Sequence, residues 1–160
     1  MKTVRIALPA AAFLAFAAAG SATAQQQTVS YEVTAVSEIS FSGSPSLVIS
    51  QAQAGTGLTS ANAAASYALT TNQSGMKITA QLGAALPDHV TLSVSLEAPS
   101  GGTTSGTVAL SDAVAKNVVT GVSKVNESGL DVTYTLAAGV NAGVVSAGTV
   151  QVMYTVTADL

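Results

Sequence analysis

The only histidine of the chain, His89, is the first residue to consider for catalysis. It follows Asp88 directly. A Ser-His-Asp site needs a carboxylate that orients the imidazole and a nucleophile beside it. Asp88 is poorly placed to orient His89, because neighbouring residues of an extended chain point to opposite faces. The chain also has no Gly-x-Ser-x-Gly motif. We therefore expect His89 to lie in a turn before a strand that starts at Val90, and we predict no catalytic residue.

The amino-acid composition also disfavours metal and cofactor sites. One histidine and no cysteine remove the usual ligands of zinc and copper. Calcium needs several oxygen ligands, but the acids are isolated along the chain, and Glu127 and Asp131 are the closest pair. The glycines at 101–102 and 139–143 lie between expected strands rather than before a helix, so they are interpreted as turns and not as phosphate loops. We expect no metal and no cofactor.

The N-terminal residues have the three parts of a secretory signal peptide. Lys2 and Arg5 precede an apolar run at residues 6–20, and Ala22-Thr23-Ala24 supplies the small-x-small cleavage pattern. The alternative is a membrane anchor, but a helical span needs roughly 20 apolar residues. We predict that residues 1–24 are a signal peptide, that cleavage follows Ala24, and that residues 25–160 form one secreted, cell-surface or periplasmic domain without a membrane span.

The charge of this domain restricts its partners. After residue 24 there are three lysines, no arginine and eight acids, which gives a net charge of −5. So few cations cannot follow a phosphate backbone, and we therefore exclude nucleic acid as a partner and disfavour anionic membrane surfaces.

Short stretches with a period of two predict the fold. In residues 29–35, Val29, Tyr31, Val33 and Ala35 share one face, and polar residues occupy the other. Further strands are expected near residues 39–41, 47–49, 66–70, 76–80, 90–96, 106–110, 118–125, 130–136 and 149–157. We expect these ten stretches to give about eight or nine strands, and that number of short strands without a long helix is typical of an all-β protein. We predict an antiparallel, immunoglobulin-like β-sandwich.

Two pairs of these strands are expected to form hairpins. Residues 72–75 and 126–129 each end in glycine and separate two alternating stretches, which favours tight turns. Residues 51–65 are expected to be a connection, with one helical turn at 61–65. The strand at 106–110 is expected to pair with the strand at 90–96.

Tyr31, Tyr134 and Tyr154 occupy similar positions in three of the predicted strands. One interpretation is a set of equivalent tyrosines that forms a site. The other, which we favour, is that each ring packs near a sheet edge while its hydroxyl group finds a backbone carbonyl or water.

Two function classes remain once an enzyme is disfavoured. The first is a structural subunit of a surface filament, pilus or coat, which binds copies of itself through sheet edges. Its candidate donor strand carries Val29, Tyr31, Val33 and Ala35, since an extended segment can complete the sheet of a neighbour. The second is a monomeric adhesion or binding module whose loops at 51–65 and 99–106 contact a surface glycan or a protein.

The order of signal peptide, N-terminal alternating strand and final strand from Gly148 to Leu160 loosely resembles secreted bacterial fimbrial and spore-coat-type subunits. That resemblance implies an immunoglobulin-like sandwich and assembly by strand exchange. In chaperone–usher pilins the final strand has an aromatic residue next to last, whereas here Asp159 holds that position and Tyr154 lies further in.

Overall fold

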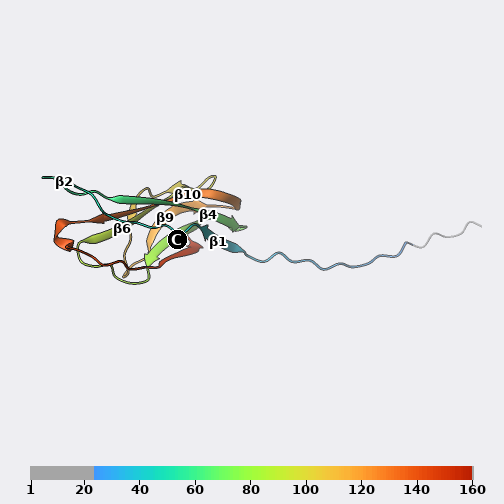
Figure 1. Cartoon of the computed structure of the whole chain (residues 1–160). Coiled ribbons are helices and arrows are strands. Elements are labelled where there is room, and N and C mark those ends of the chain that lie inside the picture. The colour runs from blue at the N-terminus through green and yellow to red at the C-terminus, as the bar shows by residue number, and fades with distance from the viewer. Residues whose placement is uncertain (1–23, 160) are drawn as a thin grey trace, which may run out of the picture. The chain divides into compact units, whose positions relative to one another are not determined.

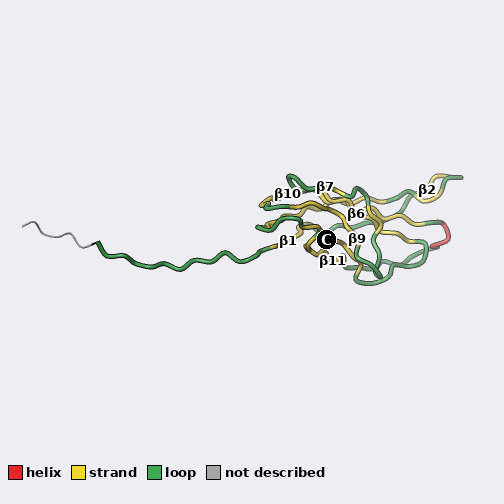
Figure 2. Tube along the Cα trace, turned by 180° about the vertical axis from the view of Figure 1, so that it is seen from behind, coloured by secondary structure: helices red, strands yellow, loops and turns green. Residues whose placement is uncertain are grey.

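The structure is a computed structural model that describes residues 24–159. These residues fall into two units, residues 24–32 and residues 33–159. The first unit contains no helix or strand, and all its residues are exposed. Within the second unit the secondary structure is β-strand apart from one short 3-10 turn (Figures 1 and 2). The described part of the chain is therefore all-β, as predicted.

The described residues form eleven strands, of which four have only two residues. In chain order the strands are β1 (Ser37–Ser42), β2 (Ala52–Gln53), β3 (Gly57–Leu58), β4 (Ala61–Thr71), β5 (Met76–Leu82), β6 (Val90–Leu96), β7 (Thr103–Thr104), β8 (Val108–Ala109), β9 (Lys116–Val122), β10 (Val125–Ala138) and β11 (Val152–Ala158). The 3-10 turn η1 (Val140–Ala142) lies between β10 and β11.

The strands form two large antiparallel sheets and one small hairpin. The first sheet has the order β1-β4-β10-β6-β8, and the second has the order β11-β5-β9-β7. The hairpin consists of β2 and β3. Val94 of β6 lies opposite Val108 of β8, which confirms the predicted pairing of these two segments.

One hydrophobic core joins the two large sheets. In β5 every second residue is buried, so the period of two marks the face that packs inward. The core residues come from both sheets, as in a β-sandwich, and burial of their side chains is the main favourable term for folding. They are Tyr67, Leu69, Met76, Ile78, Ala80, Leu82, Leu92, Val94, Leu96, Leu110, Val118, Val119, Val122, Val125, Leu130, Val132 and Tyr134.

The turn at residues 72–75 connects the two sheets and does not close a hairpin. It joins β4 of the first sheet to β5 of the second, so the predicted pairing of these strands is wrong. Tyr67 of β4 and Ile78 of β5 are both buried in the core, one from each layer. Gly75 has φ +65, a conformation that glycine adopts without strain. This local geometry serves a connection between sheets as well as it serves a hairpin.

The second predicted hairpin is also wrong, in its pairing and in its position. The chain reverses at residues 123–124 between β9 and β10, which belong to different sheets. Gly129, expected in the turn, instead has φ +74 within β10, where the register with β4 shifts between Glu127 and Leu130. Such a bulge inserts extra residues into one strand and commonly uses a glycine with positive φ.

Two further segments differ from the prediction. Residues 61–65 are not a helical turn but the first part of β4, where Ala61 pairs with Leu136 of β10. Residues 47–49 form no strand, although Leu47 packs against the core.

Candidate functional site

The predicted donor residues lie in a segment that forms no strand in this structure. Val29, Tyr31 and Val33 are 74%, 95% and 85% exposed, and Ala35 is exposed as well. The expectation that residues 29–35 form a strand is therefore not met within this chain. A row of exposed apolar side chains with a period of two is unusual for a water-soluble surface.

The side chain of Asn72 fixes the chain where it enters β1. Its Nδ2 donates to the carbonyl oxygen of Thr34 at 2.7 Å, and its Oδ1 accepts from the nitrogen of Val36 at 2.9 Å. The nitrogen of Asn72 donates in turn to the carbonyl oxygen of Val36 at 3.2 Å. This last bond continues the β1–β4 ladder beyond the Ser37–Thr71 pair. Val36 therefore lies in line with β1.

The predicted signal peptide lies almost wholly outside the described residues. This applies to Ala22 and to every other residue before Ala24, which is itself exposed. Among the helical residues within 24–159, none belongs to a helix long and apolar enough to cross a membrane.

Four aromatic residues meet between the two sheets. The ring of Phe41 in β1 stacks on Tyr154 in β11 at a centroid distance of 4.0 Å and on Tyr67 in β4 at 5.7 Å. The hydroxyl oxygens of Tyr134 and Tyr154 are 2.8 Å apart. The hydroxyl of Tyr67 donates to the carbonyl oxygen of Glu97. Each of these hydroxyl groups thus has a partner, as is usual for buried tyrosines. For Tyr134 and Tyr154 the prediction of a backbone carbonyl or water is wrong, because the two hydroxyl groups contact each other.

Burial keeps these tyrosines neutral. Removal from water raises the pKa of Tyr67, Tyr134 and Tyr154 above the usual value of a phenol. The hydrogen bond with Tyr134 raises the pKa of Tyr154 further. The hydroxyl pair connects the two sheets, because Tyr134 lies in β10 and Tyr154 in β11.

His89 lies in an exposed turn before β6, where the sequence predicts it. Its φ is +62, and its carbonyl oxygen accepts from the nitrogen of Gly139 at 2.9 Å.

Two of the glutamate side chains accept hydrogen bonds from the backbone. Glu127 accepts from the nitrogen of Ser100, and Glu97 accepts from the nitrogen of Asp131 at 2.9 Å. Within residues 24–159 no three potential ligands come close enough to hold a metal ion.

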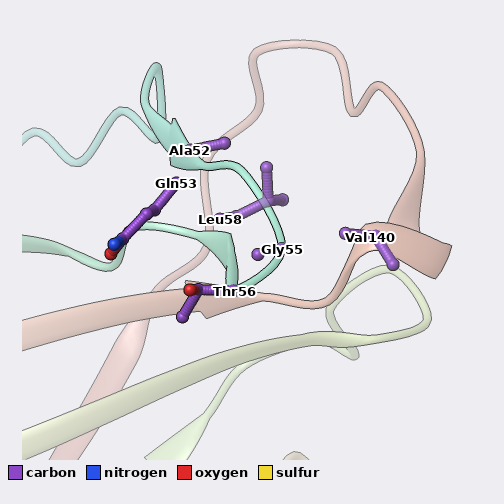
Figure 3. Close-up of a pocket in the computed structure, with 7 residues that line it drawn as sticks. Ala52, Gln53, Gly55, Thr56, Leu58 and Val140 are labelled. Carbon is purple, nitrogen blue, oxygen red and sulfur yellow. The ribbon is translucent and has the colours of Figure 1, made fainter.

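A shallow depression lies under the β2–β3 hairpin (Figure 3). It has a volume of ≈ 420 Å³ and is lined by Ala52, Gln53, Gly55, Thr56, Gly57, Leu58 and Val140. No charged side chain lines it, and Leu58 and Val140 are 38% and 69% exposed. It lies in the predicted contact loop at 51–65, but it lacks the convergent polar groups that fix a ligand.

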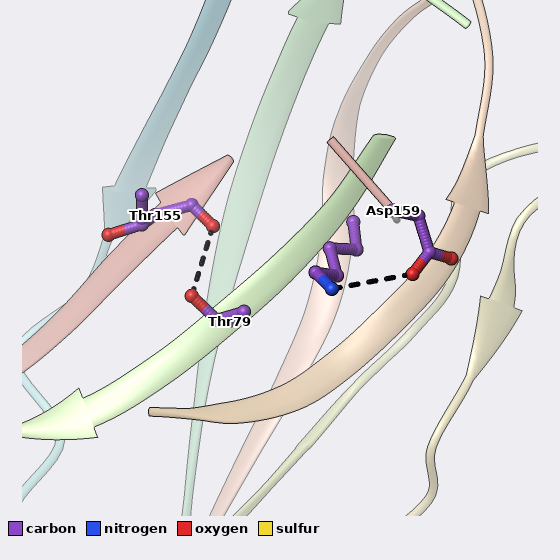
Figure 4. A network of polar contacts seen from close by, with 4 residues as sticks. Thr79, Thr155 and Asp159 are labelled. Carbon is purple, nitrogen blue, oxygen red and sulfur yellow. Dashed lines mark hydrogen bonds and ion pairs between the residues drawn. The ribbon is translucent and has the colours of Figure 1, made fainter. Parts of the chain in front are cut away.

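The two long strands at one side of the sandwich each pair on a single side within the described residues. β1 pairs only with β4, and β11 pairs only with β5. Figure 4 shows two contacts that hold β11 in place: Thr79 Oγ1 donates to the carbonyl oxygen of Thr155, and Lys77 Nζ lies 3.5 Å from Asp159 Oδ1. The sequence pattern does not reveal these free edges, because the period of two does not encode strand order.

The described residues thus define an all-β protein with two packed antiparallel sheets and a free edge on each. The chain matches no protein-family model, and no curated protein is detectably similar to it in sequence.

Proposed function

We propose that this protein is an exported, non-enzymatic structural subunit of a cell-surface filament, pilus or coat. In this proposal it has an immunoglobulin-like sandwich and assembles by adding its N-terminal segment to the sheet of a neighbouring copy. The observation that carries the proposal is the exposure of Val29, Tyr31 and Val33 at alternate positions of one segment. Strand addition of this kind combines main-chain hydrogen bonds with burial of alternate side chains.

The available apolar surface is large enough to matter. Fully burying one such side chain contributes roughly 1.5–3 kcal/mol. Three side chains, each buried about halfway, would contribute about 3 kcal/mol, which corresponds to a change of more than 100-fold in a dissociation constant. The ladder of main-chain hydrogen bonds would add specificity of register.

Export is supported by the sequence of residues 1–24, and the absence of cysteine fits assembly that does not depend on disulfides. The proposed location is therefore the cell surface or the periplasm. Copies of the same chain are the proposed partners.

The proposal is tested by expressing the full chain in an exporting host and examining the exported product. Size-exclusion chromatography and electron microscopy should reveal concentration-dependent polymers or filaments, and mass spectrometry should give an N-terminus at Gln25. A single monomer peak at every concentration, without filaments, would refute the proposal and leave the monomeric adhesion module as the surviving alternative.

A matched pair of variants tests the role of the segment. The triple variant Val29→Ser, Tyr31→Ser and Val33→Ser removes the apolar face, and we expect it to lose polymer while keeping the β-sheet circular dichroism of the monomer. The control variant Thr28→Ala and Ser30→Ala changes the opposite face of the same segment and should still polymerise. Equal loss in both variants would contradict burial of the apolar face.

A further inference from the structure

The backbone of β11 presents hydrogen-bonding groups at its free edge. Gly83 donates its N–H to the carbonyl oxygen of Gln151, and Asp159 donates its N–H to the carbonyl oxygen of Gly75. Residues of an antiparallel strand face its partner alternately. The odd-numbered residues 151–159 therefore face β5, and the N–H and C=O groups of Val152, Tyr154 and Val156 point away from β5 to the free edge.

This edge lacks the usual protection against strand addition. The seven residues of β11 include no charged residue and no proline, although natural proteins normally place such residues on exposed edges. The opposite edges of the two sheets are different, because β7 and β8 have only two residues each. The other long edge strand, β1, carries Glu38.

The exposed N-terminal segment closely matches β11 in sequence. Residues 29–35 are Val-Ser-Tyr-Glu-Val-Thr-Ala, and β11 is Val-Met-Tyr-Thr-Val-Thr-Ala, so five of seven positions are identical. Val29, Tyr31 and Val33 correspond to Val152, Tyr154 and Val156, which are the half-buried, inward-facing residues of β11. A strand beside β11 must place its apolar side chains on the same face as these three residues.

We propose that the free edge of β11 accepts residues 29–33 of a second copy, antiparallel to β11 and with Tyr31 opposite Tyr154. This inference rests on the proposed function and names the acceptor edge. Within the described residues every strand pairing is antiparallel, and the added strand follows that pattern. Its inward side chains cover the seam between β11 and β1, where Phe41 is still 36% exposed.

Addition beside β11 is favoured over replacement of β11. The strand is held by its ladder to β5, by the 2.8 Å contact of Tyr154 with Tyr134 and by the stacking of Tyr154 on Phe41. Replacement would break these contacts before the incoming segment formed its own, whereas addition breaks none of them.

The register predicts a specific cross-link. Because the backbone groups of Tyr154 face the edge, the Tyr31–Tyr154 pair is hydrogen-bonded, and Ser30 lies opposite Thr155 in a non-hydrogen-bonded pair. Such pairs have Cα atoms about 4.5 Å apart, which suits a disulfide. The chain has no cysteine of its own, so single Ser30→Cys and Thr155→Cys proteins can be mixed and oxidised without background from native thiols.

We expect Ser30→Cys and Thr155→Cys to form a mixed dimer at least ten times more abundantly than Ser30→Cys with Ser40→Cys, which reports addition to the edge of β1. As a second variant, Val152→Pro removes the edge N–H donor that lies opposite Val33 in this register and does not bond to β5. It should lose polymer and keep the circular dichroism of the monomer.

The outcomes separate the two proposals. Loss of polymer in the Val29/Tyr31/Val33 triple variant, together with cross-links only to Ser40→Cys or to neither position, would overturn the β11 assignment and leave the proposed function standing. A cross-link within one molecule of a Ser30→Cys/Thr155→Cys double variant would also overturn it. A wild-type protein that never polymerises would overturn both.

Discussion

Replacing Tyr154 by phenylalanine removes one of two hydroxyl groups that meet between the sheets. Tyr134 is 7% exposed, and its hydroxyl oxygen lies 2.8 Å from that of Tyr154. The aromatic ring of residue 154 remains in place in this variant, so its stacking on Phe41 is retained. The perturbation is therefore confined to one hydrogen bond and to the group that loses its partner.

The loss of stability in Tyr154→Phe depends on how deeply the Tyr134 hydroxyl, which loses its partner, is buried. A buried hydroxyl without a partner costs about 1–3 kcal/mol, whereas removing both partners can be nearly neutral. We expect Tyr154→Phe to lower the free energy of unfolding by about 1–2 kcal/mol, since Tyr134 is left unpaired. Tyr134→Phe should cost about 1 kcal/mol, because Tyr154 is only half-buried and water can reach its surroundings more easily.

The double variant distinguishes a true pair from two independent groups. With both hydroxyls absent, we expect a destabilisation no larger than that of Tyr154→Phe alone, which corresponds to a coupling of about 1 kcal/mol. Urea unfolding followed by far-ultraviolet circular dichroism measures these energies, in the Val29/Tyr31/Val33 triple-serine background to keep the protein monomeric. A double variant whose loss equals the sum of the single losses, within about 0.5 kcal/mol, would refute the pairing of the two hydroxyl groups.

Three further predictions concern the core and the remaining tyrosine. Tyr67→Phe removes the hydrogen bond to the carbonyl of Glu97 and should cost about 0.5–1.5 kcal/mol in urea unfolding; an unchanged midpoint would contradict the contact. Burial raises the pKa of Tyr67, Tyr134 and Tyr154, so their contribution to stability is complete below a pH of about 10, the unfolded value, and is lost as pH rises toward the folded values. The urea midpoint should therefore fall steeply above a pH of about 10, and a flat profile there would argue against burial. Ile78→Ala opens a cavity at a fully buried position and should cost about 2–5 kcal/mol, and a loss below this range, measured by thermal unfolding, would indicate that β5 is not central to the core.

The period of two predicted the class of structure because it reports directly on which side chains are buried. The expected strands at 76–80, 90–96 and 149–157 correspond to β5, β6 and β11 within a few residues. The period of two could not predict that β4 extends back to Ala61. Alanine has little preference for strands, and this end of β4 is held by its pairing with β10. Such pairing depends on residues far away in the sequence.

The two wrong hairpins have one physical cause. A short turn with a glycine at positive φ reverses the chain, but its residues do not determine whether the next strand pairs with the previous one or crosses to the facing sheet. Here the crossing turns support each other: Lys124 donates its N–H to the carbonyl of Gln73, and Gly75 donates its N–H to Ser123 Oγ at 3.1 Å. These contacts join two turns about fifty residues apart, and no local pattern records them.

In the candidate site, too, the local sequence pattern does not determine which strands pair. Residues 29–35 and β11 have nearly the same sequence, and their alternation predicts a strand with one apolar face in both cases. β11 becomes a strand because β5 supplies the facing ladder, whereas the chain around Thr34 and Val36 is fixed to Asn72 and runs straight into β1. The alternating pattern thus specifies an apolar face without specifying which molecule covers it. In the assembly that we propose, residues 29–33, which repeat the sequence of the edge strand and are exposed, are covered by the β11 edge of another copy.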